Sequence, residues 1–389
     1  MHCKVINSLA EVPAAAWNRL NTDAYPFLRH EFLYALERNR CLDEATGWYS
    51  QHLVVYGDDQ QLLGAMPLYM KDNSFGEFVF DWSWADAYQR HGLAYYPKLV
   101  SAIPFTPATG PRLLCAPGAD HQQVATCLVE AALQLARQQD CSSLHCLFTT
   151  TRDQAVLKQQ GLLTCVGCQF HWHNQSFETF EQFLATLNAK RRKNIRRERR
   201  LVQETAIELT VTTGDQLSEA DWVKVLHQFY SNTFYERGRR PPLTLAFFQE
   251  LGQSMGEQMV LAFAGKAGQR VAGAISFCSD TTLYGRHWGC RAEYDSLHFE
   301  VCYYQNIEYC IANGIQCFEP GAQGEHKIWR GFLPTLTYSA HWIAHPDFAA
   351  AIADFLRRET PAVEQYASEL NEHSPYRQYP NLDLSLMAE

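Results

Sequence analysis

The densest run of potentially reactive side chains lies between Lys190 and Arg200. It reads K-R-R-K-N-I-R-R-E-R-R, with eight basic residues and one acidic residue. Several of the arginines recur at helical spacing of three or four, so their guanidinium groups can engage phosphates together. A solvated, charged helix face is the alternative interpretation.

A second concentration extends from Tyr284 to Arg330. Glu300 and Tyr304 are one helical turn apart and can point into one site. Farther on, the segment G-A-Q-G-E-H-K-I-W-R-G places an acid, a base and two cations among three glycines. This pattern predicts a flexible loop at a strand end, where α/β proteins often carry functional groups. The alternative is a capped surface loop whose polarity has no functional meaning.

Two shorter clusters also contain ionisable groups. In G-E-F-V-F-D, Glu77 and Asp81 are predicted near a strand end, and a buried carboxylate there would have a raised pKa and could accept a proton near neutral pH. A surface acid pair is equally compatible. In C-V-G-C-Q-F-H-W-H, strand alternation separates Cys168 from the face that carries His171. The four thiol and imidazole groups therefore do not converge on a metal, and that face is instead a candidate cleft wall.

Composition limits the classes of protein to consider. The 389 residues are 47% hydrophobic and 13% aromatic, which excludes a disordered or fibrous chain. The net charge of -9 argues against a general nucleic-acid coat protein, although the basic run alone contributes +7. Thirteen cysteines without a recognisable export signal or membrane span predict reduced thiols in the cytoplasm.

The elements that must position these groups alternate between strands and helices. Strands are expected at 51–57, 61–71, 77–82, 143–148 and 162–172, with helices at 119–139 and 153–160. The basic run is predicted to lie on a helix that starts near Thr179 and is broken near Asn188. Mixed strands and helices indicate an α/β layer architecture.

A second copy of this pattern follows the basic run. Strands are predicted at 259–265, 270–277, 282–289, 316–319 and 335–343, with helices at 296–313 and 346–372. Leu63-Gly64-Ala65 matches Ala272-Gly273-Ala274 at the same place in the second strand of each hairpin. We therefore predict an internal duplication, with a first half at 1–175, a basic connecting helix at 176–205 and a second half at 206–389 that includes the C-terminal helix.

The order of these elements and several long motifs resemble the bacterial FemAB-like predicted N-acyltransferases, which are related to the Fem aminoacyltransferases. The motifs are G-E-F-V-F-D-W-S-W-A-D-A-Y, R-R-K-N-I-R-R, L-Y-G-R-H-W-G and G-A-Q-G-E-H-K. The resemblance covers nearly the whole chain. It implies a tandem duplicated GNAT-like (acyl-CoA N-acyltransferase) α/β fold, with mixed, largely antiparallel sheets flanked by helices. It also implies a peptidoglycan-related transfer of an acyl or aminoacyl group to an amine.

Such a transfer requires a proton acceptor, donors for the oxyanion and a grip on the acyl donor. In the acetyltransferase fold, coenzyme A phosphates bind a turn of the form Q/R-x-x-G-x-G/A. The segment R-H-W-G-C-R departs from this pattern at Arg291. The resemblance therefore favours aminoacyl-tRNA or another large donor, with no required cofactor. The alternatives are an acyl-CoA-dependent GNAT acetyltransferase and a non-catalytic module that binds RNA or a partner through the basic helix.

The resemblance and the residue types together give a set of expected roles, with no metal site. Four residues are expected to be catalytic: Glu300, Glu325, His326 and Tyr304. Thirteen are expected to bind substrate, with the basic helix holding the polyanionic part of a donor or acceptor: Glu77, Asp81, His171, Arg191, Arg192, Lys193, Arg196, Arg197, Tyr284, Arg286, Gln323, Lys327 and Arg330.

Overall fold

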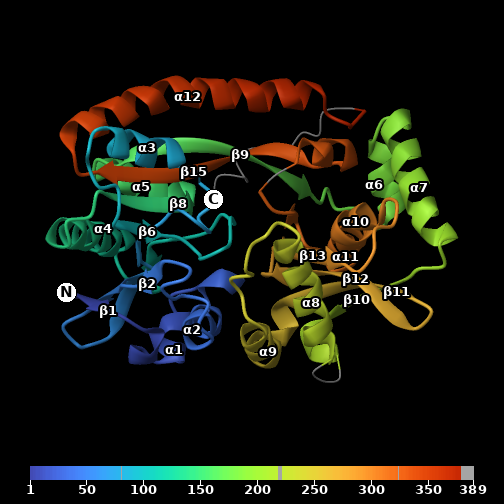
Figure 1. Ribbon diagram of the computed structural model, residues 1–389, viewed down its shortest axis with the longest axis horizontal. Helices are drawn as coiled ribbons and strands as arrows, with labels where there is room; N and C mark the ends of the chain where they lie inside the picture. The colour runs from blue at the N-terminus through green and yellow to red at the C-terminus, as the bar shows by residue number, and fades with distance from the viewer. Residues whose placement is uncertain (80, 218–220, 323, 378–389) are drawn as a thin grey trace. The chain divides into compact units, whose positions relative to one another are not determined.

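The chain divides into two compact units (Figure 1). The computed structural model describes residues 1–79, 81–217, 221–322 and 324–377. Unit 1 comprises Met1–Cys168 and Leu336–Ala367, and unit 2 comprises Gln169–Thr335 and the described residues from Ser368 onward. Three elements contribute residues to both units: β9 (Leu163–His173), β15 (Leu333–Ile343) and α12 (Pro346–Glu372).

Unit 1 contains two sheets. The first is antiparallel in the order β1 (His2–Ile6), β3 (His52–Tyr56), β4 (Leu62–Met66) and β7 (Leu114–Cys115). The second has the order β9, β15, β8 (Ser143–Thr149), β6 (Lys98–Ser101), β5 (Tyr69–Lys71) and β2 (Trp48–Ser50), and β6 runs parallel to β8. The helices are α1 (Ala14–Asn18), α2 (His30–Arg38), α3 (Trp82–Arg90), α4 (His121–Gln138) and α5 (Thr151–Gln159).

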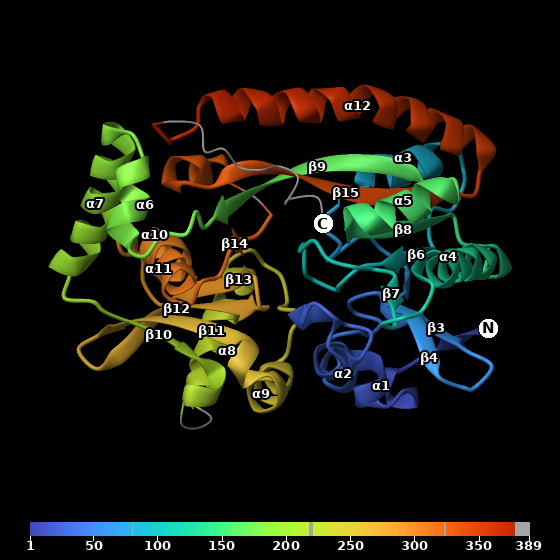
Figure 2. The ribbon, with the colours of Figure 1, turned by 180° about the vertical axis from the view of Figure 1, so that it is seen from behind.

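Unit 2 is built on the strands β10 (Glu208–Thr213), β11 (Met259–Lys266), β12 (Gln269–Cys278), β13 (Thr282–Cys290) and β14 (Cys317–Glu319), followed by the end of β9. These strands are antiparallel except for β13 and β14, which run parallel. The helices, seen from behind in Figure 2, are α6 (Phe180–Thr186), α7 (Ala189–Glu204), α8 (Asp221–Tyr235), α9 (Leu245–Ser254), α10 (Leu297–Phe299) and α11 (Gln305–Ala312). A π-helical turn at Glu300–Tyr304 joins α10 to α11.

Each unit repeats an antiparallel hairpin and one parallel strand pair joined by a helical crossover. The hairpins are β3–β4 and β11–β12, and the crossovers contain α4 in unit 1 and α10–α11 in unit 2. Gly64 and Gly273, which occupy matching positions in the two hairpins, are both required for the same physical reason. A Cβ on Gly64 would lie 2.3 Å from Val124 of α4, and one on Gly273 would lie 2.5 Å from Leu226 of α8, so both glycines permit a helix to pack closely. The predicted fold class is confirmed in both units.

The predicted break in the basic helix is confirmed. Asn188 has an extended backbone, and its side chain accepts a hydrogen bond of 3.0 Å from the amide of Arg191. It therefore ends the connection from α6 and caps α7, which carries the basic run.

The strand predicted at 77–82 is wrong. Gly76 and Phe78 both have positive φ angles, of 81° and 62°, so the chain turns here instead of extending. Asp81 immediately precedes α3, which begins at Trp82. The alternation of acids with aromatic residues in this segment therefore reflects a turn.

None of the helices within the described ranges combines the length and the apolar character that crossing a membrane would require.

Candidate functional site

Helix α7 separates its apolar and basic residues onto opposite faces. Its buried apolar residues, Ile195 and Val202, are seven positions apart and therefore lie on the same face of the helix. At about 100° per residue, the exposed basic residues fall within an arc of roughly 120° on the other side. We call this set the cationic face of α7; it consists of Lys190, Lys193, Arg196, Arg197 and Arg200.

The inner side of α7 is tied to the π-helical turn and to the loop after β14. Glu198, the one acid of the basic run, accepts hydrogen bonds of 2.7 and 3.2 Å from the guanidinium of Arg330. It also accepts a hydrogen bond from the hydroxyl of Tyr304. Arg330 in turn lies 3.4 Å above the ring of Phe299. Glu198 therefore links two of the residues expected from the sequence to be functional.

The neighbouring Arg199 makes a second link. It donates to Glu308 at 2.8 and 3.0 Å and to Glu300 at 3.2 Å. Gln305 donates to the other oxygen of Glu300 at 2.8 Å. Burial raises the pKa of Glu300, and the positive charge of Arg199 acts against that shift. Both carboxylate oxygens of Glu300 are thus engaged within the protein.

Replacing Glu198 with alanine is expected to lower the free energy of unfolding by about 2 kcal/mol, because Arg330 would stay buried without its carboxylate partner. Urea denaturation of the two proteins measures the difference. Glu204→Ala removes an exposed acid from the same helix, which pairs with the exposed Arg200 at 3.5 Å, and should cost less than about 0.5 kcal/mol. Equal midpoints for the two variants would contradict the inferred link.

The loop after β14 is held by its own backbone carbonyls. Lys327, 2% exposed, donates to the carbonyls of Gly321 at 2.7 Å and Pro320 at 3.3 Å. Burial lowers the pKa of Lys327 to about 8. Gly324 has a φ of 115°, and a Cβ there would lie 2.5 Å from the ring of His326, so only glycine fits. This turn positions His326, whose Nε2 lies 3.1 Å from the hydroxyl of Tyr303.

Strands β13 and β14 separate where this loop begins, at the end of β14. Their parallel pairing ends where Tyr284 meets Glu319. On the other edge of β13, Ser276 pairs with Gly285 and Ile275 with His287, so Arg286 is the extra residue of a β-bulge. Bulges of this kind re-aim side chains and are frequent beside functional sites.

The structure brings Glu300, Tyr304 and Arg330 to the inner side of α7. His326 and Lys327 lie on the same 3-10 turn as Arg330, Glu325–Arg330. Arg191 and Arg192 turn away from the cationic face: Arg191 lies 4.7 Å from the ring of Trp329, and Arg192 donates to the carbonyl of Leu187 at 3.4 Å. His171 is buried on β9, with its Nε2 3.2 Å from Oε1 of Gln169. Glu325 is exposed. Gln323 lies outside the described residues.

Glu77 and Asp81 belong to unit 1, where both are buried against Lys98 at the start of β6. Lys98 donates to Glu77 at 2.8 Å and to Asp81, and Tyr95 donates to Asp81 at 2.6 Å. Burial raises the pKa of Glu77 to about 7, whereas Lys98 outweighs burial at Asp81 and holds its pKa well below the usual range. The sequence signalled the two acids but not Lys98, which stands among apolar strand residues.

Two histidines extend this group. His145 on β8 lies 2.7 Å from the hydroxyl of Ser143, and its Nδ1 is 2.6 Å from Nδ1 of His341 on β15. Sequence reasoning missed both. A histidine in an otherwise apolar strand, as in S-L-H-C-L-F and S-A-H-W-I, is the signal that was available.

Burial holds many histidines neutral in both units. It lowers the pKa of His173, His298 and His341 to about 4, and takes the pKa of His145, His171 and His287 well below 6.5. The unfolded chain binds protons below pH 6.5 and the folded chain does not, so this stability is complete above pH 6.5 and is lost as the pH falls toward 4. Glu77 and Asp153 act in the opposite sense, because burial raises their pKa values to about 7 and about 6, and this stabilises the fold at lower pH.

We therefore expect the free energy of unfolding to fall by at least about 2 kcal/mol between pH 7 and pH 5, since these six histidines outnumber Glu77 and Asp153. Urea denaturation at half-unit pH steps measures the change. Constant stability down to pH 4.5, with loss only where ordinary carboxylates titrate, would contradict this expectation.

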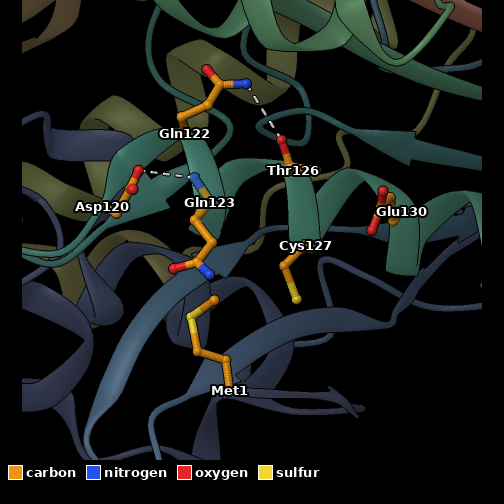
Figure 3. A pocket seen from close by; sticks show the side chains of 7 residues that line it. All are labelled: Met1, Asp120, Gln122, Gln123, Thr126, Cys127 and Glu130. Atoms are coloured by element: carbon orange, nitrogen blue, oxygen red, sulfur yellow. Dashed lines mark hydrogen bonds between the residues drawn. The ribbon is translucent and has the colours of Figure 1, made fainter.

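A pocket of about 460 Å³ lies in unit 1 beside the start of α4 (Figure 3). Its polar groups serve α4 and its contact with α5: Asp120 caps the amide of Gln123 at 3.1 Å, and Gln122 donates to Thr126 at 3.4 Å and to Gln159 of α5 at 2.8 Å. None of the residues expected to be functional lines this pocket, so we assign it no role.

Comparison with known proteins identifies the family to which the chain belongs. Residues 8–378 match the FemAB-like family, described as peptidoglycan biosynthesis and recognition. The chain belongs to the FemAB-like family. No curated protein matches the chain in sequence.

Two solved structures share its fold. The C-terminal domain of a putative lysylphosphatidylglycerol synthetase from Agrobacterium fabrum is similar with a TM-score of 0.51 and 11% identity, over 89% of this chain and 96% of that one. FemX is similar with a TM-score of 0.51 and 12% identity. The match covers 91% of this chain and 100% of the FemX chain. At these identities the likeness establishes the fold alone.

Proposed function

We propose that the chain is an N-acyltransferase that transfers an acyl or aminoacyl group from a polyanionic donor, of the class of aminoacyl-tRNA, to an amine. Membership of the FemAB-like family and the fold shared with FemX support the reaction class. One observation supports the donor: α7 presents its cationic face to solvent while its inner side contacts Glu300, Tyr304 and Arg330 through Glu198 and Arg199.

The positive charge of the cationic face is only partly compensated within the described residues, which favours an anionic partner. Lys190, Lys193 and Arg197 make no hydrogen bond or ion pair with any residue in the described ranges, whereas Arg196 lies 2.5 Å from Glu181. Like charges at helical spacing destabilise a helix unless an anion compensates them. A nucleic-acid backbone supplies such anions at regular intervals, and its binding releases counterions.

The backbone of β13 favours a donor other than coenzyme A. The segment expected to resemble a phosphate-binding turn, R-H-W-G-C, lies within a strand. Gly289 and Trp288 pair with Gly273 and Ala274 of β12, and α10 begins only at Leu297. Phosphate-binding turns instead direct free backbone amides from the N-terminus of a helix.

His326 is the proton acceptor we assign for the attacking amine. It is half-buried, and burial, with the charges of Arg330 and Lys327, lowers its pKa, so its imidazole is neutral at pH 7. Glu300 has both oxygens engaged by Arg199 and Gln305, and Glu325 is exposed. In the transfer the amine nitrogen bonds to the acyl carbon, the amine's proton passes to His326, the ester bond to the ribose oxygen of the tRNA breaks, and His326 returns the proton to that departing oxygen, which leaves as a hydroxyl.

The test is transfer of radiolabel from charged tRNA to a mixed pool of amines. We expect label to appear in a small, ribonuclease-resistant product with wild-type protein, and no label when the tRNA is uncharged before incubation. A protein that is inactive with every charged tRNA but active with an acyl-coenzyme A would overturn the proposed donor. Binding of RNA without any transfer would instead favour a non-catalytic module.

A further inference from the structure

A pocket of about 350 Å³ opens in unit 1 beside the end of α4 and the end of β15. Small-molecule sites in proteins occupy roughly 300–1,000 Å³, so this volume suits one small ligand. Every residue that lines the pocket belongs to unit 1 and to the described ranges. Of these residues, Leu93, Arg137 and Asp140 are exposed. The pocket is therefore open to solvent, and a ligand can enter it without movement of the chain.

Two polar atoms of the pocket lining are buried without a hydrogen-bond partner. They are the hydroxyl of Tyr88 and Nδ1 of His345, and neither has a partner in the part of the chain that the structure describes. Tyr88 is 3% exposed, and its ring is held against Phe348 and Tyr95 at centroid distances of 4.0 and 5.2 Å. Because buried polar groups in folded proteins are nearly always satisfied, the two atoms indicate a polar group of a ligand inside the pocket. A hydroxyl fits this place, since it both donates and accepts.

The pocket also has an apolar wall. Trp342 and Leu93 line it, and Leu93 is 39% exposed. The guanidinium of Arg137 lies over the ring of Trp342, 5.3 Å from its centroid. Contacts between aromatic rings are favourable when they are offset or edge to face, so a planar ring can pack against the indole. The wall therefore favours a ligand with an aromatic body.

One cation and one anion stand among the exposed lining residues, and they are not paired with each other. Arg137 and Asp140 are joined at the end of α4, where the amide of Asp140 donates to the carbonyl of Arg137 at 3.4 Å. Neither side chain makes a hydrogen bond or an ion pair with a residue in the described ranges. An α-amino acid carries a carboxylate and an ammonium on one carbon. It can therefore engage a guanidinium with the first group and a carboxylate with the second.

We infer that this pocket binds a free aromatic α-amino acid whose side chain ends in a hydroxyl, the class to which tyrosine belongs. The carboxylate of the ligand binds Arg137, and its ammonium binds Asp140. The ring packs on Trp342, and the hydroxyl meets the buried polar atoms of Tyr88 and His345. No group assigned to the transfer takes part, so the site does not depend on the proposed function.

The first test is equilibrium dialysis of the full chain against radiolabelled L-tyrosine, without tRNA or any acyl donor. Two competitors keep the hydroxyphenyl ring: hydroxyphenylpropionate lacks the ammonium, and tyramine lacks the carboxylate. We expect saturable binding of one tyrosine per chain, with each competitor at least about tenfold weaker than unlabelled tyrosine. No saturable binding, or equal competition by either analogue, would overturn the inference. Since transfer is not measured, failure here leaves the proposed function untouched.

The second test removes each exposed charge in turn. Arg137→Gln and Asp140→Asn should each weaken binding of tyrosine at least about tenfold. Both side chains are exposed, and asparagine tolerates the φ of 50° found at Asp140, so both variants should fold, which circular dichroism checks. Arg152→Gln removes an exposed arginine from α5 and should leave the affinity unchanged. Wild-type affinity in Arg137→Gln or in Asp140→Asn contradicts the site.

The third test concerns the buried end of the pocket. Wild-type protein should bind tyrosine at least about tenfold more tightly than phenylalanine, because a site built around a ligand hydroxyl rejects the analogue that lacks it. Tyr88→Phe removes the protein's own hydroxyl and keeps the ring that contacts Phe348 and Tyr95. In this variant the preference should fall to about threefold or less. Equal affinities in the wild type, or a full preference in Tyr88→Phe, sink the inference.

Discussion

Replacing Lys98 with methionine is expected to lower the free energy of unfolding by about 4 kcal/mol, because two carboxylates would stay buried without their shared cation. Lys98 has no exposed surface and donates to Glu77, Asp81 and Ser74. Methionine retains the length of the side chain, so the loss reports charge and hydrogen bonding rather than a cavity. Urea denaturation monitored by tryptophan fluorescence measures it.

The control is Lys158→Met, which removes an exposed lysine from α5 in the same unit and should change stability by less than about 0.5 kcal/mol. A triple variant, Lys98→Met with Glu77→Gln and Asp81→Asn, removes the uncompensated charges and should recover part of the loss. If Lys98→Met unfolds at the same urea concentration as Lys158→Met, the buried network does not exist as described.

His326→Gln is expected to lower kcat for aminoacyl transfer by about 100-fold or more, the effect typical of losing a general base. Glutamine preserves a hydrogen-bonding partner for Tyr303 but cannot take the amine's proton at neutral pH. Affinity for charged tRNA should be unchanged, because the cationic face is intact. Single-turnover transfer and filter binding separate the two quantities.

Glu325→Gln is the matched control, since Glu325 is the adjacent exposed residue of the same loop and is not assigned a role in proton transfer. Its kcat should stay within a few-fold of wild type. If Glu325→Gln loses as much activity as His326→Gln, the proton acceptor has been assigned to the wrong residue.

Periodicity and capping residues were enough to predict most of the regular elements. The break at Asn188 could be predicted because asparagine caps helices and the basic run then follows with helical spacing. The segment at 77–82 could not, because Phe78 adopts a positive φ that its residue type does not favour. Alternating acids and aromatic residues there imitate a strand.

The candidate sites were only partly visible in the sequence. Glu300, Tyr304, His326 and Arg330 lie close along the chain, and helical spacing or a shared loop indicates that they meet. The contact between Glu198 and Arg330 could not be predicted, because the two residues are 132 positions apart and only the fold brings them together. Lys98, His145 and His341 come from three strands, and only the pairing of β6, β8 and β15 brings them together.

In the proposed function the cationic face of α7 holds the polyanionic part of the donor. The most direct measurement compares kcat/KM for charged tRNA with kcat/KM for the matching aminoacyl-adenosine, in wild type and in the triple variant Lys190→Ala, Lys193→Ala and Arg197→Ala. We predict at least a tenfold loss with charged tRNA, a shallower dependence on salt, and no change with aminoacyl-adenosine. An equal loss with both donors, or no loss with charged tRNA, would contradict the claim.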